Sequence, residues 1–186
     1  MNVLHPTLWR TCRVLANGMR LRVLRRVLAA REICVSGVAA QCGVSIPAAT
    51  ESLRALQARG LIRSRRQGVR VWYRAAADPE VEHAPALLAA VRAAIRGRVT
   101  DRGIVCAATA FTHPRRIVLV RVLKQGPAPA AVLSAHCGMS LSALCRHLHK
   151  LQRRNVAAMD ERGLWRLTRP RSRLARRLVR LALREG

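Results

Sequence analysis

The chain has 186 residues, and its 35 Lys and Arg against 9 Asp and Glu give a formal net charge of +26. Hydrophobic residues make up 51% of the sequence and aromatic residues only 3%, so we expect aliphatic cores on helices and not a large sheet. This composition argues against global disorder. The charge favours nucleic acid as a partner, with an anionic membrane surface second and ribosomal RNA compatible with composition alone.

The sequence shows no sign of export or membrane insertion. Met1 to Arg10 lacks the basic segment and apolar run of a signal peptide. Because Arg interrupts every candidate, no apolar stretch reaches the roughly 18 residues that a spanning helix needs. The 6 cysteines lack the close spacing of a disulfide scaffold, which predicts a reducing cytoplasm.

The first elements predicted along the chain are three helices. The spacing of apolar residues places them over 7–16, 20–28 and 35–41. The third is followed by Gly43, which can adopt the left-handed conformation that a tight turn requires.

A fourth helix follows this turn. The Ser45 hydroxyl can accept a hydrogen bond from a free backbone N–H, and Pro47 lies in the first turn. We expect the helix to run to about Arg59, where Gly60 stops it. Its buried face consists of Ala49, Leu53 and Leu56.

After Gly60 the pattern changes from helix to strand. Residues 61–74 predict two short strands around a tip near Gln67 and Gly68. Helices followed by a basic hairpin are the element order of a winged helix-turn-helix. Downstream, a helix is predicted to start at Asp78 and to continue through Ile95.

The second half of the chain repeats the first at an offset of 95 residues. Residues 40–45, Ala-Gln-Cys-Gly-Val-Ser, recur as residues 135–140, Ala-His-Cys-Gly-Met-Ser. Identities that keep this offset without a gap predict a tandem duplication into two units, 1–97 and 98–186.

The second unit is expected to contain the same elements. Its opening helix is predicted over 100–110, and its wing strands over 156–159 and 164–168. Trp165 aligns with Trp72 if this wing is two residues shorter than the first.

Three stretches of the first copy carry a family resemblance. They are Leu15–Leu24, Ser45–Leu56, and Gly60 with the later Val-Trp-Tyr-Arg of 71–74. Together they resemble the ArsR-like winged-helix repressors of bacteria. The resemblance implies a mainly α fold with small β-wings. It also implies that the two fused units form an intramolecular pseudo-dimer about a pseudo-two-fold axis, through their first and last helices.

The family's metal-sensing motif is incomplete in this chain. Arsenic-sensing members carry Glu-Leu-Cys-Val-Cys-Asp, whereas residues 32–37 read Glu-Ile-Cys-Val-Ser-Gly and lack the second cysteine. Cys145 and His149, four residues apart on one predicted helix, would permit a metal site, but structural cysteines are the favoured interpretation. We therefore expect no metal and no cofactor.

The candidate DNA-binding residues lie on the exposed faces of the two recognition helices and on the first wing. In the first copy they are Ser45, Ile46, Pro47, Thr50, Glu51, Arg54, Arg63, Arg65, Arg66 and Arg70. In the second copy they are Ser140, Ser142, Arg146, His149, Lys150 and Arg153. Arg54 and Arg146 are the candidates for reading guanine. Because the second wing tip carries Asp160 and Glu161, we expect copy two to bind more weakly, or through its helix only.

The predicted function is a sequence-specific, double-stranded DNA-binding transcriptional regulator that acts as a repressor at the bacterial nucleoid. Two alternatives stay open: a nucleoid-associated or replication-type protein of low sequence specificity, and a protein-interaction scaffold. The basic terminal helix, Arg171–Arg184, could lie on an anionic membrane, but we expect its leucines to pack on the protein body. No catalytic grouping is recognisable, so the chain is not expected to be an enzyme.

Overall fold

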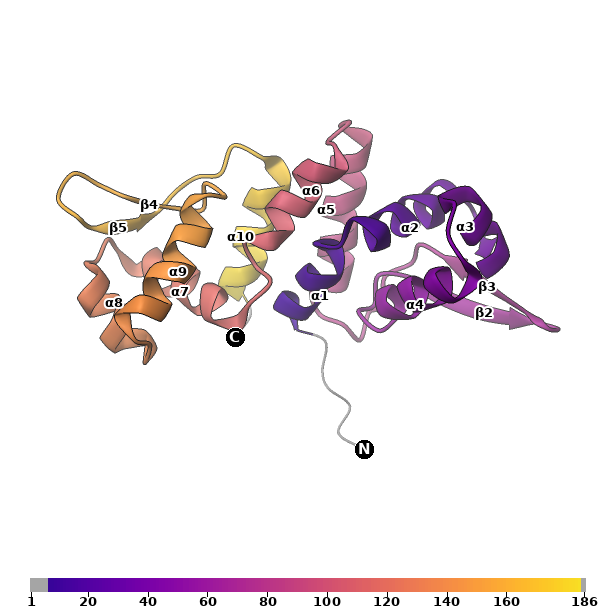
Figure 1. Cartoon of the computed structure of the whole chain (residues 1–186), viewed down its shortest axis with the longest axis horizontal. Coiled ribbons are helices and arrows are strands. Elements are labelled where there is room, and N and C mark those ends of the chain that lie inside the picture. The colour runs from indigo at the N-terminus through magenta and orange to yellow at the C-terminus, as the bar shows by residue number, and fades with distance from the viewer. Residues whose placement is uncertain (1–6, 185–186) are drawn as a thin grey trace. The chain divides into compact units, whose positions relative to one another are not determined.

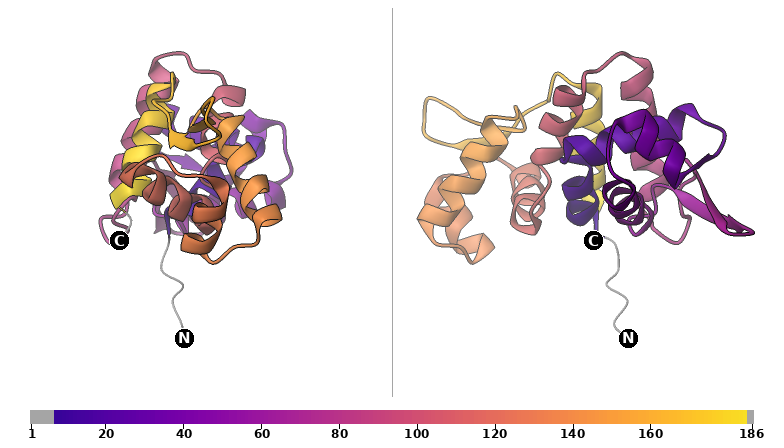
Figure 2. Two further views of the ribbon diagram at one scale, coloured as in Figure 1. Left: turned by 90° about the vertical axis from the view of Figure 1, so that its left-hand side faces the viewer. Right: turned by 45° about the vertical axis from the view of Figure 1, so that its right-hand side comes forward.

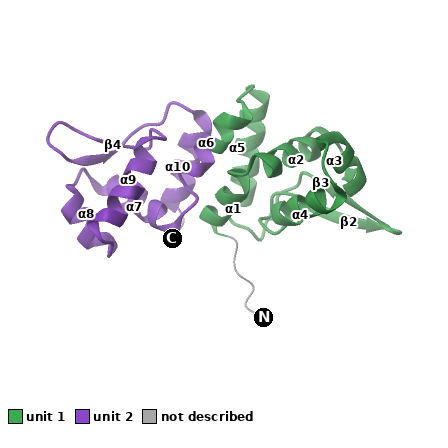
Figure 3. Cartoon of the chain, in the orientation of Figure 1, with its two compact units in different colours: residues 1–105 green, residues 106–186 purple. Residues whose placement is uncertain are grey.

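The computed structural model describes residues 7–184 (Figure 1, with two further views in Figure 2). The chain forms two compact units, residues 1–105 and 106–186 (Figure 3). This division falls inside a helix, α6 (Asp101–Thr109), and so differs from the predicted boundary after residue 97. The start of α6 is held in unit 1, because Arg25 forms an ion pair with Asp101 and donates a hydrogen bond to the Val99 carbonyl at 2.9 Å.

Unit 1 consists of helices and one small sheet. Its elements before α6 are α1 (Leu8–Leu15), α2 (Gly18–Ala29), β1 (Ile33–Cys34), α3 (Val35–Cys42), α4 (Ile46–Gln57), β2 (Arg63–Gln67), β3 (Arg70–Arg74) and α5 (Ala84–Arg96). Each of the four helices predicted before Gly60 is present, with ends that move by one or two residues.

The turn between α3 and α4 forms as the sequence predicts. Gly43 takes the left-handed conformation at φ +63°. The Ser45 hydroxyl accepts a hydrogen bond from the backbone N–H of Ala48 at 3.4 Å, which caps α4. Ala49, Leu53 and Leu56 are fully buried, so the opposite face of α4 is presented to solvent.

The wing of unit 1 is a β2–β3 hairpin that extends away from the helices (Figure 2). Gln67 pairs with Arg70, which leaves Gly68 and Val69 at the tip. The sheet also contains β1, which pairs with β3 in the order β1-β3-β2 and was not predicted. Two residues are too few to show the alternation that identifies a strand.

The helix that leads out of the wing starts later than predicted. Residues 78–83 form turns, and α5 begins at Ala84. Pro85 explains the difference, because its ring would clash with the carbonyl four residues earlier if the helix extended back past Val81. Val81 is instead buried against Gly60.

Unit 2 has the same order of helices and hairpin. After α6 its elements are α7 (Pro114–Gln125), α8 (Ala130–Cys137), α9 (Leu141–Gln152), β4 (Ala157–Met159), β5 (Trp165–Leu167) and α10 (Arg173–Arg184). Gly138 ends α8 at φ +58°, as Gly43 ends α3. Ser140 caps α9 by accepting from the backbone N–H of Ala143 at 3.4 Å.

The strand pairing corrects the predicted alignment of the two wings. Ile33 pairs with Tyr73 in unit 1, and Ala128, the residue 95 positions after Ile33, bridges to Trp165 in unit 2. The hairpin register gives the same match, because Ser64 pairs with Tyr73 and Met159 with Trp165. Trp165 therefore replaces the buried Tyr73 and not Trp72, and the second wing is three residues shorter rather than two.

The terminal helix α10 is amphipathic and packs within unit 2. Leu174 and Leu178 are buried, and α10 contacts α7. The exposed side of the helix carries Arg173, Arg177, Arg180 and Arg184. Within residues 7–184, no helix combines the length and the apolar character needed to cross a membrane.

Candidate nucleic-acid interface

The outward face of α4 forms the centre of the candidate interface in unit 1. Its exposed members are Ser45, Ile46, Pro47, Glu51 and Arg54. Thr50 is half-buried and donates its hydroxyl proton to the Ile46 carbonyl at 2.8 Å, so it can offer a partner only the oxygen lone pairs.

Charge on this face is partly neutralised within the unit. Oε1 of Glu51 lies 3.2 Å from Nη2 of Arg20 on α2. Arg54 has no ion pair among the residues that the structure describes, so its guanidinium is available for two parallel hydrogen bonds. Of Glu51 and Arg54, Arg54 is therefore the stronger candidate for contact with a base edge.

Of the four wing arginines that the sequence proposes for DNA binding, two are engaged by carboxylates. Arg65 makes a bidentate pair with Glu32, with N–O distances of 2.8 and 2.6 Å. The hydrogen bond from Arg65 lowers the pKa of Glu32 below its ordinary value and raises the pKa of Arg65. Nη2 of Arg63 lies 3.3 Å from Oδ1 of Asp78.

The other two of these four arginines have no carboxylate partner within the described residues. Arg66 donates to the Gly68 carbonyl at the tip, at 3.1 Å, and Arg70 is exposed. These two guanidiniums are therefore the ones best placed to meet an external anion.

The outward face of α9 differs from that of α4 in its charge. Arg146, Lys150 and Arg153 are exposed and spaced four and three residues apart, so they form one stripe along the helix. The residues of α4 at the same offset are Glu51, Ala55 and Ala58. Ser140 and Ser142 are exposed beside this stripe, and His149 packs edge-on against Trp165 with ring centroids 6.0 Å apart.

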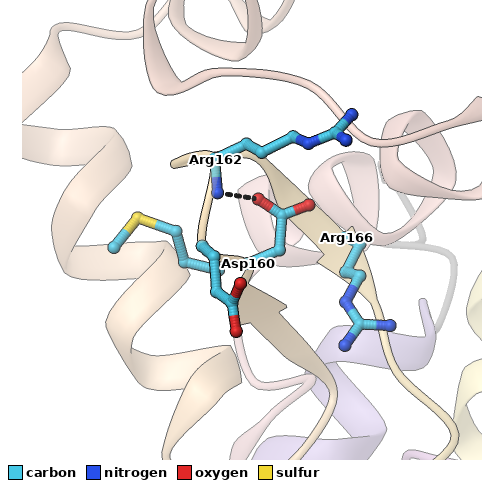
Figure 4. A pocket seen from close by; sticks show the side chains of 5 residues that line it. Asp160, Arg162 and Arg166 are labelled. Atoms are coloured by element: carbon cyan, nitrogen blue, oxygen red, sulfur yellow. Dashed lines mark hydrogen bonds between the residues drawn. The ribbon is translucent and has the colours of Figure 1, made fainter.

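The tip of the second wing is held by one of its acids. Oδ1 of Asp160 accepts a hydrogen bond from the backbone N–H of Arg162 at 3.0 Å (Figure 4). It accepts a second one from the backbone N–H of Leu164 at 2.9 Å. A shallow, open hollow there is lined by Met159, Asp160, Glu161, Arg162 and Arg166. Oδ1 of Asp160 is thus engaged by its own backbone, while Glu161 is exposed.

Two histidines near α9 were not singled out by the sequence. His147, half-buried on α9, and His113, the N-cap of α7, lie with ring centroids 4.6 Å apart. Burial, and after it the positive charges of His113, Arg116, Arg115 and Arg146, together lower the pKa of His147 to about 4. The pair was missed because its members lie far apart in the sequence.

The cysteines lie apart from one another. All 6 are free thiols. Cys42 is buried at the first turn, and burial raises the pKa of Cys137 at the second. A hydrogen bond with Ser36 lowers the pKa of Cys34. Residues 7–184 hold no cluster of three or more His, Cys, Asp or Glu side chains that could bind a metal ion.

Comparison with known proteins supports the fold and the class of protein. No protein-family profile matches the chain. The HTH-type transcriptional regulator Rv0324 of Mycobacterium tuberculosis is 39% identical over 69 residues, which cover 37% of this chain and 30% of that protein. The match thus spans less than a third of the relative's length.

The matches to solved structures are partial. The winged helix-turn-helix DNA-binding domain of Mb0332 from Mycobacterium bovis, titled a possible ArsR-family regulator and homodimeric, is 32% identical with a TM-score of 0.40, over 49% of this chain and 80% of that one. A crystal structure of a possible transcriptional regulatory protein from the same organism is 34% identical, with a TM-score of 0.38, over 47% and 88%. Reduced HlyU from Vibrio cholerae is 22% identical, with a TM-score of 0.39, over 47% and 84%.

The order of helices and hairpin, with the similarity to a curated regulator, confirms the winged helix-turn-helix fold that the predicted resemblance implies. The chain is a winged helix-turn-helix protein that is similar to transcriptional regulators.

Proposed function

We propose that the protein reads a specific sequence in double-stranded DNA and represses transcription by occluding the bound site. The observation that carries this proposal is the exposed face of α4, where Arg54 has no ion pair within the described residues. An exposed helix of this kind fits the major groove, where a guanidinium can donate two hydrogen bonds to guanine. The similarity to an HTH-type transcriptional regulator supports the same function.

In this proposal the wing of unit 1 binds the DNA backbone. Arg66 and Arg70 supply charge-assisted hydrogen bonds to phosphates, which set the position of α4 but carry no sequence information. Arg65 and Arg63 contribute less, since Glu32 and Asp78 already hold them.

The two units are proposed to act as an intramolecular pseudo-dimer with unlike readers. Unit 1 presents Glu51 and Arg54 on its recognition helix, and unit 2 presents Arg146, Lys150 and Arg153. The bound site is therefore expected to have two different halves. One chain per duplex, measured by light scattering of the complex, would support the pseudo-dimer, and two chains per duplex would contradict it.

Selection of bound sequences from a random duplex pool at about 150 mM salt tests the function, because nonspecific charge binding is weakened there. We expect a defined motif. Arg54→Ala should lower affinity for this motif by about ten- to a hundredfold and relax the preference at one guanine, as for loss of a bidentate base contact. The matched control is Arg102→Ala, which removes the same charge from an exposed position on α6.

A different result would favour another function. If no motif is enriched and binding fades uniformly as salt rises, the chain is a nucleoid-type protein of low specificity, which its net charge of +26 also allows. If duplex DNA is bound only weakly at any sequence, the protein-interaction scaffold becomes the better explanation.

A further inference from the structure

Unit 2 has two cations where unit 1 has an ion pair. At the offset of 95 residues, Arg20 corresponds to Arg115 and Glu51 to Arg146. Arg20 and Glu51 neutralise each other in unit 1, at 3.2 Å. Arg115 and Arg146 are both exposed, and neither forms an ion pair with any residue of 7–184. The same place in the fold therefore carries a net positive charge in unit 2 only.

Two imidazoles complete this cluster. Nδ1 of His113 accepts a hydrogen bond from the backbone N–H of Arg115 at 3.1 Å. The neutral ring therefore carries its proton on Nε2, where it can act as a donor. His147 lies beside it, with the ring centroids 4.6 Å apart, and so links the start of α7 to α9.

The charged groups that act on the pKa of His147 are all positive. After burial, the charges of His113, Arg116, Arg115 and Arg146 lower its pKa, and no described carboxylate acts in the opposite direction. These groups therefore lie close enough to His147 to repel a proton there. An anion bound among them would remove this repulsion.

We propose that Arg115, Arg146, His113 and His147 bind one phosphate group of the backbone of duplex DNA. This site rests on the DNA-binding function proposed above. It adds a contact that unit 1 lacks, because Arg20 of unit 1 is already paired with Glu51. The stripe of cations continues from Arg146 along α9, which suits a polyanion better than a small isolated anion.

The test transfers the charge pattern of unit 1 to unit 2 in the full chain. Arg146→Glu recreates an Arg–Glu pair with Arg115. Arg146→Gln only removes one charge, and it is the variant to measure if Arg146→Glu fails to fold. Affinity for a duplex of arbitrary sequence is measured across salt concentrations. We expect the slope of log affinity against log salt to become shallower in both variants, by about one for Arg146→Glu, which abolishes the single phosphate contact, and by less for Arg146→Gln, which leaves Arg115 free to bind.

The matched control is Arg121→Glu, which makes the same change in net charge at an exposed position on α7. It should change the slope by much less than Arg146→Glu. Equal slopes for the wild type and both Arg146 variants would overturn the phosphate site, as would a control that matches Arg146→Glu.

Histidine NMR of the full chain gives a second readout. On binding of the duplex the pKa of His147 should rise from about 4, because a phosphate charge favours the protonated ring. Inorganic phosphate alone is titrated in the same way. If it shifts the NMR signals of His113 and His147 to saturation, and the salt slopes of the variants are unchanged, the site binds a free anion and the DNA contact is overturned. A wild-type chain that binds no duplex would instead refute the proposed function itself.

Discussion

Arg116 is a buried cation with a structural task. Its Nε donates to the Ala110 carbonyl at 2.7 Å, and its Nη2 donates to the Thr109 carbonyl and the Thr112 hydroxyl, at 3.2 and 2.6 Å. These carbonyls lie at the end of α6, where backbone acceptors lack partners inside the helix. The residue at the same offset in unit 1 is the fully buried Leu21. One position in the fold is thus filled by an aliphatic side chain in one unit and by a capping guanidinium in the other.

Replacement of this guanidinium should destabilise unit 2. Arg116→Leu restores the residue type of unit 1 but leaves the Ala110 carbonyl without its donor, while the Thr109 carbonyl keeps only the hydrogen bond from the Thr112 hydroxyl at 3.3 Å. We expect the free energy of unfolding to fall by about 1–3 kcal/mol, the cost of a buried acceptor left unpaired. Chemical denaturation measures this loss. Arg121→Leu, exposed on the same helix, should change stability by less than about 0.5 kcal/mol, and a similar loss in both variants would contradict the role of Arg116.

His147 should make stability depend on pH. Its pKa in the folded chain is about 4, against 6.5 for an ordinary His, so the unfolded chain binds a proton first as the pH falls. The free energy of unfolding should therefore decrease between pH 6.5 and 4 and level off below. His147→Gln should flatten this part of the curve, whereas His136→Gln, at an exposed site, should leave it unchanged. Parallel curves for the wild type and His147→Gln would disprove the assignment.

At the scale of elements, local signals sufficed for the helices and for the existence of the wings. The caps at Ser45 and Ser140 and the turns at Gly43 and Gly138 are formed by residues within a few positions of one another, so the sequence contains their cause. The strand β1 could not be predicted, since it exists only through pairing with β3, far along the chain. The wing register also required the pairing partners, which is why Trp165 was aligned one position away from Tyr73.

The junction between α4 and the wing depends on Gly60. Its φ of +67° is left-handed, and a Cβ atom there would lie 2.9 Å from Cγ2 of Val81. We expect Gly60→Ala to lower the free energy of unfolding by about 2–3 kcal/mol, from the backbone conformation and the close contact together. Gly43→Ala is the matched control, because its φ is +63° with no atom within 4 Å of the added Cβ. It should cost only about 1 kcal/mol in denaturant titrations. Equal losses of stability in the two variants would mean that Val81 moves away from the added Cβ atom without an energetic cost.

At the scale of the whole molecule, the sequence predicted two units and proposed the residues of a candidate interface. The residues of the candidate interface are exposed apart from the half-buried Thr50. The ion pairs of the chain could not be predicted from the sequence. The Glu32–Arg65 pair joins residues 33 positions apart, and the Arg25–Asp101 pair that holds α6 in unit 1 joins residues 76 apart. Contacts over such separations depend on tertiary packing. Tertiary packing also places the boundary between the units after residue 105, and not after residue 97 as predicted.

The contrast between Glu51 and Arg146 has a consequence for how such a protein can change over generations. In a symmetric homodimer each substitution in the recognition helix appears twice, so both halves of the target must change together. Here α4 and α9 are encoded separately, and a substitution in one leaves the other as it was. Under the proposed function, the sequence preference of each helix can therefore change by itself. The proposed DNA target could then be exchanged one half at a time, while the unaltered half keeps the protein bound.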